Sequence, residues 1–147
     1  MKAAYREALK AYAAGEVPVG CVIVLNDKII ARAHNLKKKK KSALEHAEII
    51  AITKAAKKLG GWRLLDTELY VTLEPCPMCA GAIMQSRVKR VVFGAYDPKA
   101  GSLVSLMHMY EVPGYNHYPA FEGGVYREPC SQILTRFFHE IRFKSPE

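Results

Sequence analysis

Apolar positions recur at helical spacing near the start of the chain, which predicts a helix over residues 2–14. Residues 18–25 are nearly all apolar and β-branched, as expected for a strand covered on both faces. Asn26-Asp27 is typical of a tight turn, and a second strand is expected over residues 28–33. The first third of the chain therefore predicts a helix followed by a β-hairpin.

Helical spacing returns near Leu44 and continues to Gly60-Gly61, with one apolar face made by Ile49, Ile52, Ala56 and Leu59. A short strand over 69–73 then leads to a helix over 75–86, which has a proline in its first turn, and to a buried strand over 88–95. This alternation of strands and helices predicts an α/β sandwich with a mixed sheet.

Residues 96–124 are rich in Gly, Pro, Tyr and Asn, so we expect a long loop with one short helix near 103–110. A final helix is predicted over 127–143. The pattern contains neither an internal repeat nor a linker, and 147 residues suit one core, so residues 1–147 are expected to form a single domain.

Composition narrows the class of protein. The chain lacks the roughly 20 consecutive apolar residues of a membrane span. Charged residues interrupt the first ten positions, which argues against a secretory signal, so a soluble, cytoplasmic protein without membrane contact is expected. The formal charge of +8 fits a polyanionic partner and plain solubility equally well. The run Lys37–Lys41 predicts a solvated loop that like-charge repulsion keeps extended.

Two clusters carry candidate chemistry: His46-Ala47-Glu48 and Pro75-Cys76-Pro77-Met78-Cys79. Each lies at the start of a predicted helix, where the helix dipole favours the thiolate form of cysteine that binds metals. Cys-x-x-Cys on a first helical turn places both sulfurs on one side, and one imidazole completes three ligands. His46, Cys76 and Cys79 therefore predict one Zn²⁺ per chain.

Three protein ligands leave a fourth position for water, which is the pattern of a catalytic zinc site. Glu48 follows His46 by two residues and can act as general base and then general acid. Taken alone, this glutamate would be explained by the helix N-terminus. His-x-Glu followed by Pro-Cys-x-x-Cys is, however, the known signature of zinc-dependent nucleobase deaminases, in which the glutamate is not a ligand.

The remaining cysteines carry no such signal. Cys21 lies in an apolar run and is expected in the core, and Cys130 precedes the last helix without a partner at useful spacing.

Beyond the signature, the chain resembles the bacterial tRNA-specific adenosine deaminases of the cytidine deaminase-like superfamily. The resemblance covers most of the chain, in the segments Gly15-Glu16-Val17-Pro18-Val19-Gly20, His46-Ala47-Glu48, Leu69-Tyr70-Val71-Thr72-Leu73-Glu74-Pro75-Cys76, Met78-Cys79-Ala80-Gly81-Ala82, Ser86-Arg87, Val91-Val92-Phe93-Gly94-Ala95 and Asn116-His117. It departs from the family at Ser42-Ala43-Leu44-Glu45, where Asp-Pro-Thr-Ala is usual. Tyr118-Pro119 also interrupts the ladder of a strand that the family tends to have there.

The resemblance implies a three-layer αβα sandwich and a homodimer. It implies that adenosine at the wobble position of a tRNA anticodon stem-loop becomes inosine by attack of zinc-activated water at C6, with Glu48 as proton shuttle. Asn35 corresponds to the substrate-pocket asparagine, and the backbone of Ala47 lies against the base. Asp97 and Asn116 match positions in loops near the nucleotide.

Two alternatives stay open on the residues. A deaminase of a free base or nucleoside, of guanine or cytosine type, would carry the same zinc motif. A non-catalytic zinc module that binds nucleic acid would need a fourth protein ligand and would have no use for Glu48. The basic charge and the extended resemblance favour RNA over a free base.

Overall fold

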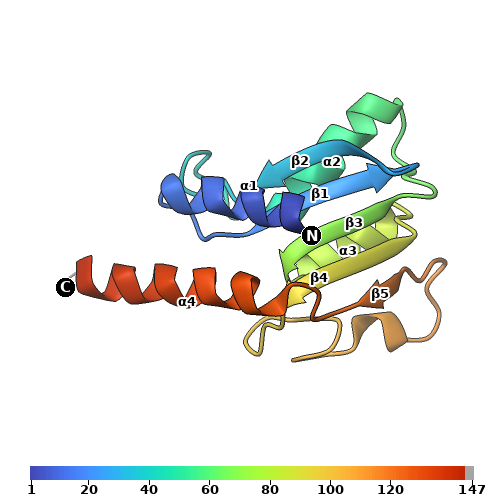
Figure 1. Ribbon diagram of the computed structural model, residues 1–147. Coiled ribbons are helices and arrows are strands. Elements are labelled where there is room, and N and C mark those ends of the chain that lie inside the picture. The colour runs from blue at the N-terminus through green and yellow to red at the C-terminus, as the bar shows by residue number, and fades with distance from the viewer. Residues whose placement is uncertain (145–147) are drawn as a thin grey trace.

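The computed structural model describes residues 1–144 (Figure 1). Its helices are α1 (Lys2–Ala13), α2 (Ala47–Leu59), α3 (Pro77–Gln85) and α4 (Arg127–Lys144), with a short 3₁₀ turn η1 (Met109–Glu111). Its strands are β1 (Gly20–Leu25), β2 (Lys28–His34), β3 (Glu68–Leu73), β4 (Arg90–Ala95) and β5 (Ala120–Glu122).

Within these residues the strands form one sheet in the order β2-β1-β3-β4-β5. Strand β1 is antiparallel to both of its neighbours, whereas β4 runs parallel to β3 and to β5. Helices α1 and α4 cover one face, and α2 and α3 cover the other (Figure 1). The predicted three-layer αβα sandwich with a mixed sheet is confirmed.

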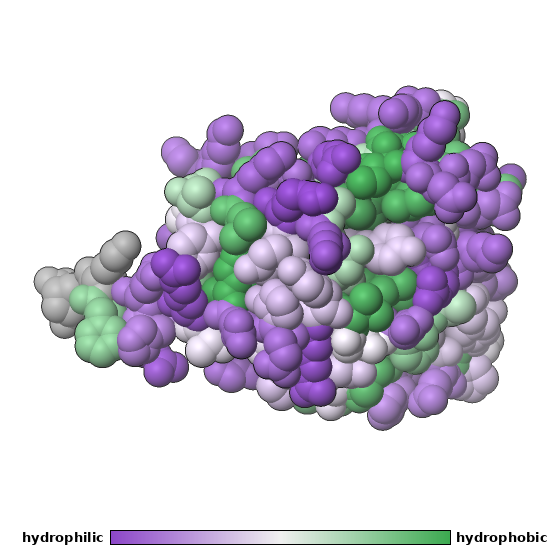
Figure 2. All heavy atoms as spheres, in the orientation of Figure 1, coloured by the Kyte–Doolittle hydropathy of each residue, from purple (hydrophilic) through white to green (hydrophobic). Residues whose placement is uncertain are grey.

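Helix α1 packs closely on β1 because Gly20 has no side chain. A Cβ at this position would lie 2.0 Å from the carbonyl oxygen of Ala4 and 2.4 Å from the backbone nitrogen of Ala8. The face of α1 that meets the sheet correspondingly consists of the small residues Ala4, Ala8 and Ala11, together with the buried Glu7. The outer surface of α1 and α4 is largely hydrophilic, and apolar surface lies between the two helices (Figure 2).

The predicted hairpin is confirmed. Asn26 and Asp27 both have positive φ angles, 51° and 63°, as the tight turn between two antiparallel strands requires. Gly60 ends α2 in the left-handed region, with φ of 75°. The first strand begins at Gly20 rather than at residue 18, because Pro18 has no backbone N–H to donate to a ladder.

The two helices of the candidate site begin two or three residues later than predicted. His46 and Cys76 have extended backbone angles, with ψ of 151° and 172°, and α2 and α3 start immediately after them. Both ligand positions are therefore the capping residues that precede a helix. Strand β4 likewise begins at Arg90, not at residue 88.

Residues 96–124 differ most from expectation. The prediction of a short helix near 103–110 was wrong, since the described chain has only the three-residue turn η1 in this region. Strand β5 pairs with β4 directly after Pro119, and the Ala120 N–H donates to the Lys89 carbonyl at 3.0 Å. The proline does not interrupt the ladder, because it precedes the first paired residue and no N–H is required of it.

The lysine run is compact rather than extended. Lys40 N–H donates to the Leu36 carbonyl and Ser42 N–H to the Lys37 carbonyl, at 2.9 and 3.1 Å. The buried carboxylate of Glu16 accepts the backbone N–H groups of Lys38 and Lys39 at 3.0–3.1 Å. These bonds fold the segment although the five side chains repel one another, because all five remain exposed to solvent.

No helix among residues 1–144 is long and apolar enough to cross a membrane.

Candidate metal centre and active site

Two helix N-termini bring the three predicted ligands together. His46 precedes α2, Cys76 precedes α3, and these helices pack against each other. His46 Nδ1 lies 3.7 Å from Cys76 Sγ and 3.4 Å from Cys79 Sγ. All three ligand atoms lie within 4.8 Å of one another. In the described part of the chain, this is the cluster of His, Cys and acidic groups that can hold a metal ion.

The donor set fits zinc. Tetrahedral zinc with bonds of about 2.0–2.3 Å places neighbouring nitrogen and sulfur ligands roughly 3.5 Å apart, close to both nitrogen–sulfur distances here. Two thiolate sulfurs and one imidazole suit zinc, whereas magnesium and calcium prefer oxygen ligands. Three protein ligands leave one coordination position open, as in catalytic zinc sites.

The two thiols are arranged to lose protons to a metal. The Cys79 thiol lies in hydrogen-bonding contact with the Cys76 sulfur, which lowers the pKa of Cys76 to about 4 and raises the pKa of Cys79. Contact with His46 lowers the pKa of Cys76 further. Cys76 is therefore the thiol of the pair that loses its proton more readily, and a bound zinc ion would also displace the proton of Cys79.

Glu48 lies beside the ligands without joining them. Its side chain is buried, and burial raises the pKa of Glu48 to about 7. The Cys79 thiol contacts the Glu48 carboxylate. Glu48, His46 and Cys76 line the same cavity of about 150 Å³. A carboxylate placed in this way can take a proton from one atom in the cavity and deliver it to another.

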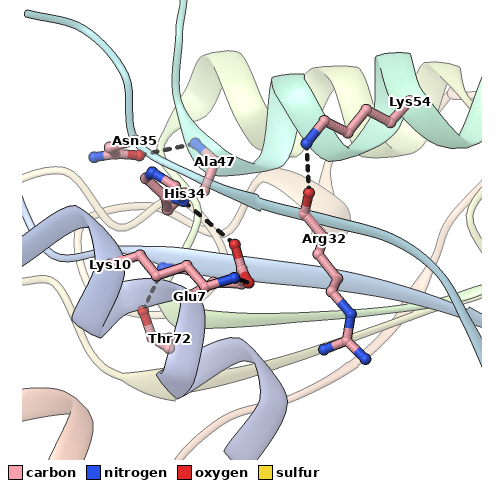
Figure 3. A network of polar contacts seen from close by, with 9 residues as sticks. Glu7, Lys10, Arg32, His34, Asn35, Ala47, Lys54 and Thr72 are labelled. Atoms are coloured by element: carbon pink, nitrogen blue, oxygen red, sulfur yellow. Dashed lines mark hydrogen bonds and ion pairs between the residues drawn. The ribbon is translucent and has the colours of Figure 1, made fainter. Parts of the chain in front are cut away.

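Asn35 reaches the same cavity from the end of β2. Its side-chain oxygen accepts the backbone N–H of Ala47 at 2.8 Å (Figure 3). This bond commits the side-chain oxygen of Asn35 to α2, and the amide nitrogen points away from Ala47 (Figure 3). The sequence-predicted residues Asn35 and Ala47 are thus brought together next to His46.

Asp97 also lines the cavity, together with Lys37 of the lysine run. One carboxylate oxygen of Asp97 accepts the backbone N–H groups of Lys99 and Ala100, at 3.0 and 3.2 Å. The carboxylate of Asp97 therefore both stabilises the turn that follows it and borders the cavity. Asn116 lies elsewhere: it borders a separate hollow with Arg87 and His117, beyond the C-terminal end of α3.

Sequence reasoning missed Glu74, which holds the loop that borders the cavity. Its buried carboxylate accepts the N–H groups of Asp97, Leu103, Val104 and Ser105 at 2.8–3.2 Å and contacts the Ser105 hydroxyl. Burial alone would raise the pKa of Glu74, but the bonds from Ser105, Asp97 and Val104 outweigh it and lower the pKa. The available signal was a carboxylate at the end of a buried strand, next to Pro75-Cys76.

This fold and this site define a zinc-binding deaminase domain, and similarity to known proteins agrees. Residues 1–95 match the family described as "Cytidine and deoxycytidylate deaminase zinc-binding region". A solved structure described as a study of A-to-I editing by tRNA:A34 deaminases superposes with a TM-score of 0.88 at 40% identity, covering 91% of this chain and 97% of that one.

Sequence similarity extends over nearly the whole chain. It is 51% identical over 144 residues to the tRNA-specific adenosine deaminase of Bacillus subtilis, covering 98% of this chain and 89% of that protein. The chain belongs to the tRNA-specific adenosine deaminase family. A guanine deaminase of Bacillus subtilis shares the fold at lower similarity, with 31% identity, a TM-score of 0.64, and coverage of 99% of this chain and 93% of that one.

Proposed function

We propose that this protein converts adenosine at the wobble position of a tRNA anticodon to inosine. The observation that carries the proposal is the three-ligand site with a buried Glu48 in its cavity. It occurs in a chain that is 51% identical to the tRNA-specific adenosine deaminase of Bacillus subtilis. The reaction is a hydrolysis, in which C6 of adenine gains an oxygen from water and loses its amino group as ammonia.

His46, Cys76 and Cys79 would hold one zinc ion, which when bound supplies an acidified water at neutral pH. The carboxylate of Glu48 would accept a proton from the attacking water and return it to the departing amino nitrogen. Burial excludes bulk water from Glu48, so the carboxylate keeps the proton within the cavity between the two transfers. The amide nitrogen of Asn35 binds the base edge and orients it toward the metal position, and the backbone at Ala47, whose N–H is bonded to Asn35, lies against the base.

Charge and shape support an RNA substrate. The lysine run stands at the rim of the cavity, which Lys37 lines, and its side chains are exposed. Phosphates near a cluster of lysines release counterions and bind in a salt-dependent manner. A free base offers no phosphate, so this arrangement favours a polyanionic substrate over the free-base alternative.

A second cavity, of about 650 Å³, adjoins the first between α4 and the end of β4. Val17, Leu73 and Asp97 line both cavities. The larger one also presents Phe138 and Arg142 on α4, an aromatic ring and a guanidinium that suit stacking on a nucleobase and contact with a phosphate. We assign this groove to nucleotides that flank the target adenosine.

The homodimer is also a proposal. Residues 104–121 include several exposed apolar side chains, among them Leu106, Met107 and Val112, and a second copy of this chain would cover them. Sedimentation at micromolar concentration tests this assembly. With tRNA as substrate, the proposed place of action is the cytoplasm.

Mass analysis of an anticodon stem-loop after incubation with the zinc-loaded protein tests the function. A gain of about 1 Da per loop, as an amino group becomes an oxygen, is expected, while free adenosine, guanine and cytosine stay unchanged. Deamination of guanine with an unchanged stem-loop would instead favour the free-base activity.

A further inference from the structure

Helix α1 presses a carboxylate against the sheet. Glu7 is 4% exposed and belongs to the face of α1 that packs on β1 and β2. Burying a carboxylate costs desolvation free energy that an apolar residue would not incur, unless partners compensate. Glu7 has two partners: Lys10 Nζ at 2.7 Å and His34 Nδ1 at 3.3 Å (Figure 3).

The bond to His34 connects α1 to the active-site end of β2. His34 is the last residue of β2, and the next residue is Asn35. In the sheet His34 pairs with Gly20, the position at which the backbone of α1 touches β1. Glu7 therefore holds the strand end one residue before the amide that faces the cavity.

The same contact region includes β3. The Gly20 N–H donates to Thr72 Oγ1 at 3.1 Å, and Thr72 is buried one residue before the end of β3. Figure 3 shows Glu7, His34 and Thr72 close together beneath the Asn35–Ala47 bond. Helix α1 thus reaches the ends of both strands that lead into the site, and Glu7 is its polar contact to β2.

We propose that Glu7 is a positioning residue for substrate binding, acting through His34 on the amide of Asn35; this rests on the proposed function. Without an acceptor at Glu7, the imidazole of His34 is free to rotate, and the backbone at residues 34–35 loses a restraint. Asn35 then presents its amide nitrogen less often in the orientation that binds the base. His46 and Cys76 directly precede α2 and α3, Cys79 lies in the first turn of α3, and none of the three contacts Glu7 or His34, so the zinc ligands are expected to keep their geometry.

Variants at Glu7 separate positioning from general support of the fold. Glu7→Ala removes the acceptor and is expected to raise KM for the stem-loop about tenfold, the scale on which partners of site residues act, with kcat and zinc content unchanged. Glu7→Gln keeps an acceptor oxygen and should recover most of the loss. Lys10→Ala, the matched control, removes the other partner of Glu7 and should leave KM within about twofold.

A double-mutant cycle tests whether the effect passes through Asn35. In an Asn35→Ala background, Glu7→Ala should change KM by less than about twofold, because the amide it positions is already absent. The same tenfold rise in both backgrounds would overturn the proposal. If Glu7→Ala does not fold, His34→Ala removes the same contact at the partly exposed partner. His34→Gln restores an N–H donor and should return KM toward the value of the parent protein.

A second measurement needs no substrate, so failure of the proposed function is distinguishable from failure of this inference. The ¹⁵N-correlated side-chain amide signal of Asn35 is expected to shift in Glu7→Ala and in His34→Ala, but neither in Glu7→Gln nor in Lys10→Ala. An unmoved Asn35 signal in the first two variants would overturn the positioning role whichever substrate the enzyme takes.

Discussion

The side-chain oxygen of Asn35 lies 2.8 Å from the backbone nitrogen of Ala47 and accepts its hydrogen bond. Ala47 is the first residue of α2, so its N–H is one of the donors that a helix cannot satisfy internally. The bond joins the end of β2 to the start of α2 and closes the intervening loop, which carries the lysine run. One amide side chain thus accepts the first N–H of the helix that carries Glu48 and also borders the cavity.

Glu48→Gln tests the proton shuttle. The substitution keeps the size of the side chain but cannot cycle a proton, so turnover of a stem-loop should fall at least about a hundredfold. Zinc content and stem-loop affinity should stay unchanged, because Glu48 is not among the clustered ligand atoms. Single-turnover deamination and metal analysis on one preparation measure both.

Glu45→Gln is the matched control for that variant. Glu45 lies three residues earlier, and its carboxylate makes a partly exposed ion pair with Lys40 at 3.9 Å. Its loss should change turnover by no more than about twofold, since exposed ion pairs contribute little. Near-normal turnover of Glu48→Gln with its zinc intact would refute the mechanism.

Cys76→Ala and Cys79→Ala should each abolish tight zinc binding, because two ligands do not hold the ion as three do. The control is Cys130→Ala, since Cys130 is a buried free thiol outside the cluster. Metal analysis after dialysis should find about one zinc per chain in the control and in the parent protein, as expected for a single site. A full zinc complement in the Cys76 and Cys79 variants would exclude the assigned site.

Replacing Lys38 and Lys39 by Ser tests phosphate contact by the lysine run. The backbone bonds to Glu16 persist in this variant, so the loop keeps its shape. If both side chains contact phosphates, the slope of log affinity against log salt should become shallower by about 1.4 for a single-stranded loop. The same change at Lys57 and Lys58, exposed at the opposite end of α2, should leave the slope as it was.

Asp97→Asn tests recognition of ribose. Asparagine keeps the oxygen that accepts the N–H groups of Lys99 and Ala100, so the turn should survive. If the other carboxylate oxygen accepts a ribose 2′-hydroxyl, the rate gap between ribose and deoxyribose at the target position should narrow. The two rates are measured on stem-loops that differ only in the sugar at the target position. An unchanged ratio between them would show that Asp97 serves only to stabilise its turn.

Glu74→Gln should destabilise the fold at neutral pH by about 1–3 kcal/mol, because charged hydrogen bonds to backbone groups are lost. The pKa of Glu74 is lowered in the folded protein, so its ionisation stabilises the fold above the unfolded pKa of about 4.3. That contribution disappears as pH falls through the lower folded value. Urea unfolding should show the gap between parent and variant closing below about pH 4. A gap that is constant with pH would contradict this account.

The metal ligands and the alternation of strands and helices could be predicted because they depend on local spacing. Cys76 and Cys79 lie one helical turn apart, and the hairpin turn at Asn26-Asp27 is short. Their chemistry is visible in any window of a few residues. The late start of α2 and α3 was not visible, because the capping role of His46 and Cys76 depends on their ψ angles.

The loop partners could not be predicted because they join distant residues. Glu16 folds the lysine run from 22 residues away, and Glu74 holds the N–H groups of Leu103–Ser105 from about 30 residues away. A carboxylate that binds backbone groups leaves no pattern in its partners' side chains. Strand β5 has only three residues, all exposed, and is too short to show an alternating pattern of apolar and polar positions.

His46 and Cys79 are 33 residues apart along the chain, whereas Cys76 and Cys79 share one helical turn. An unfolded chain therefore offers zinc a two-sulfur chelate, and the imidazole arrives only when β3 has joined β1 and has carried Cys76 to the start of α2. Closing that long loop is entropically costly, so it follows the local contacts. The third ligand bond thus requires the assembled sheet, and zinc contributes its full affinity only to chains whose central sheet is complete.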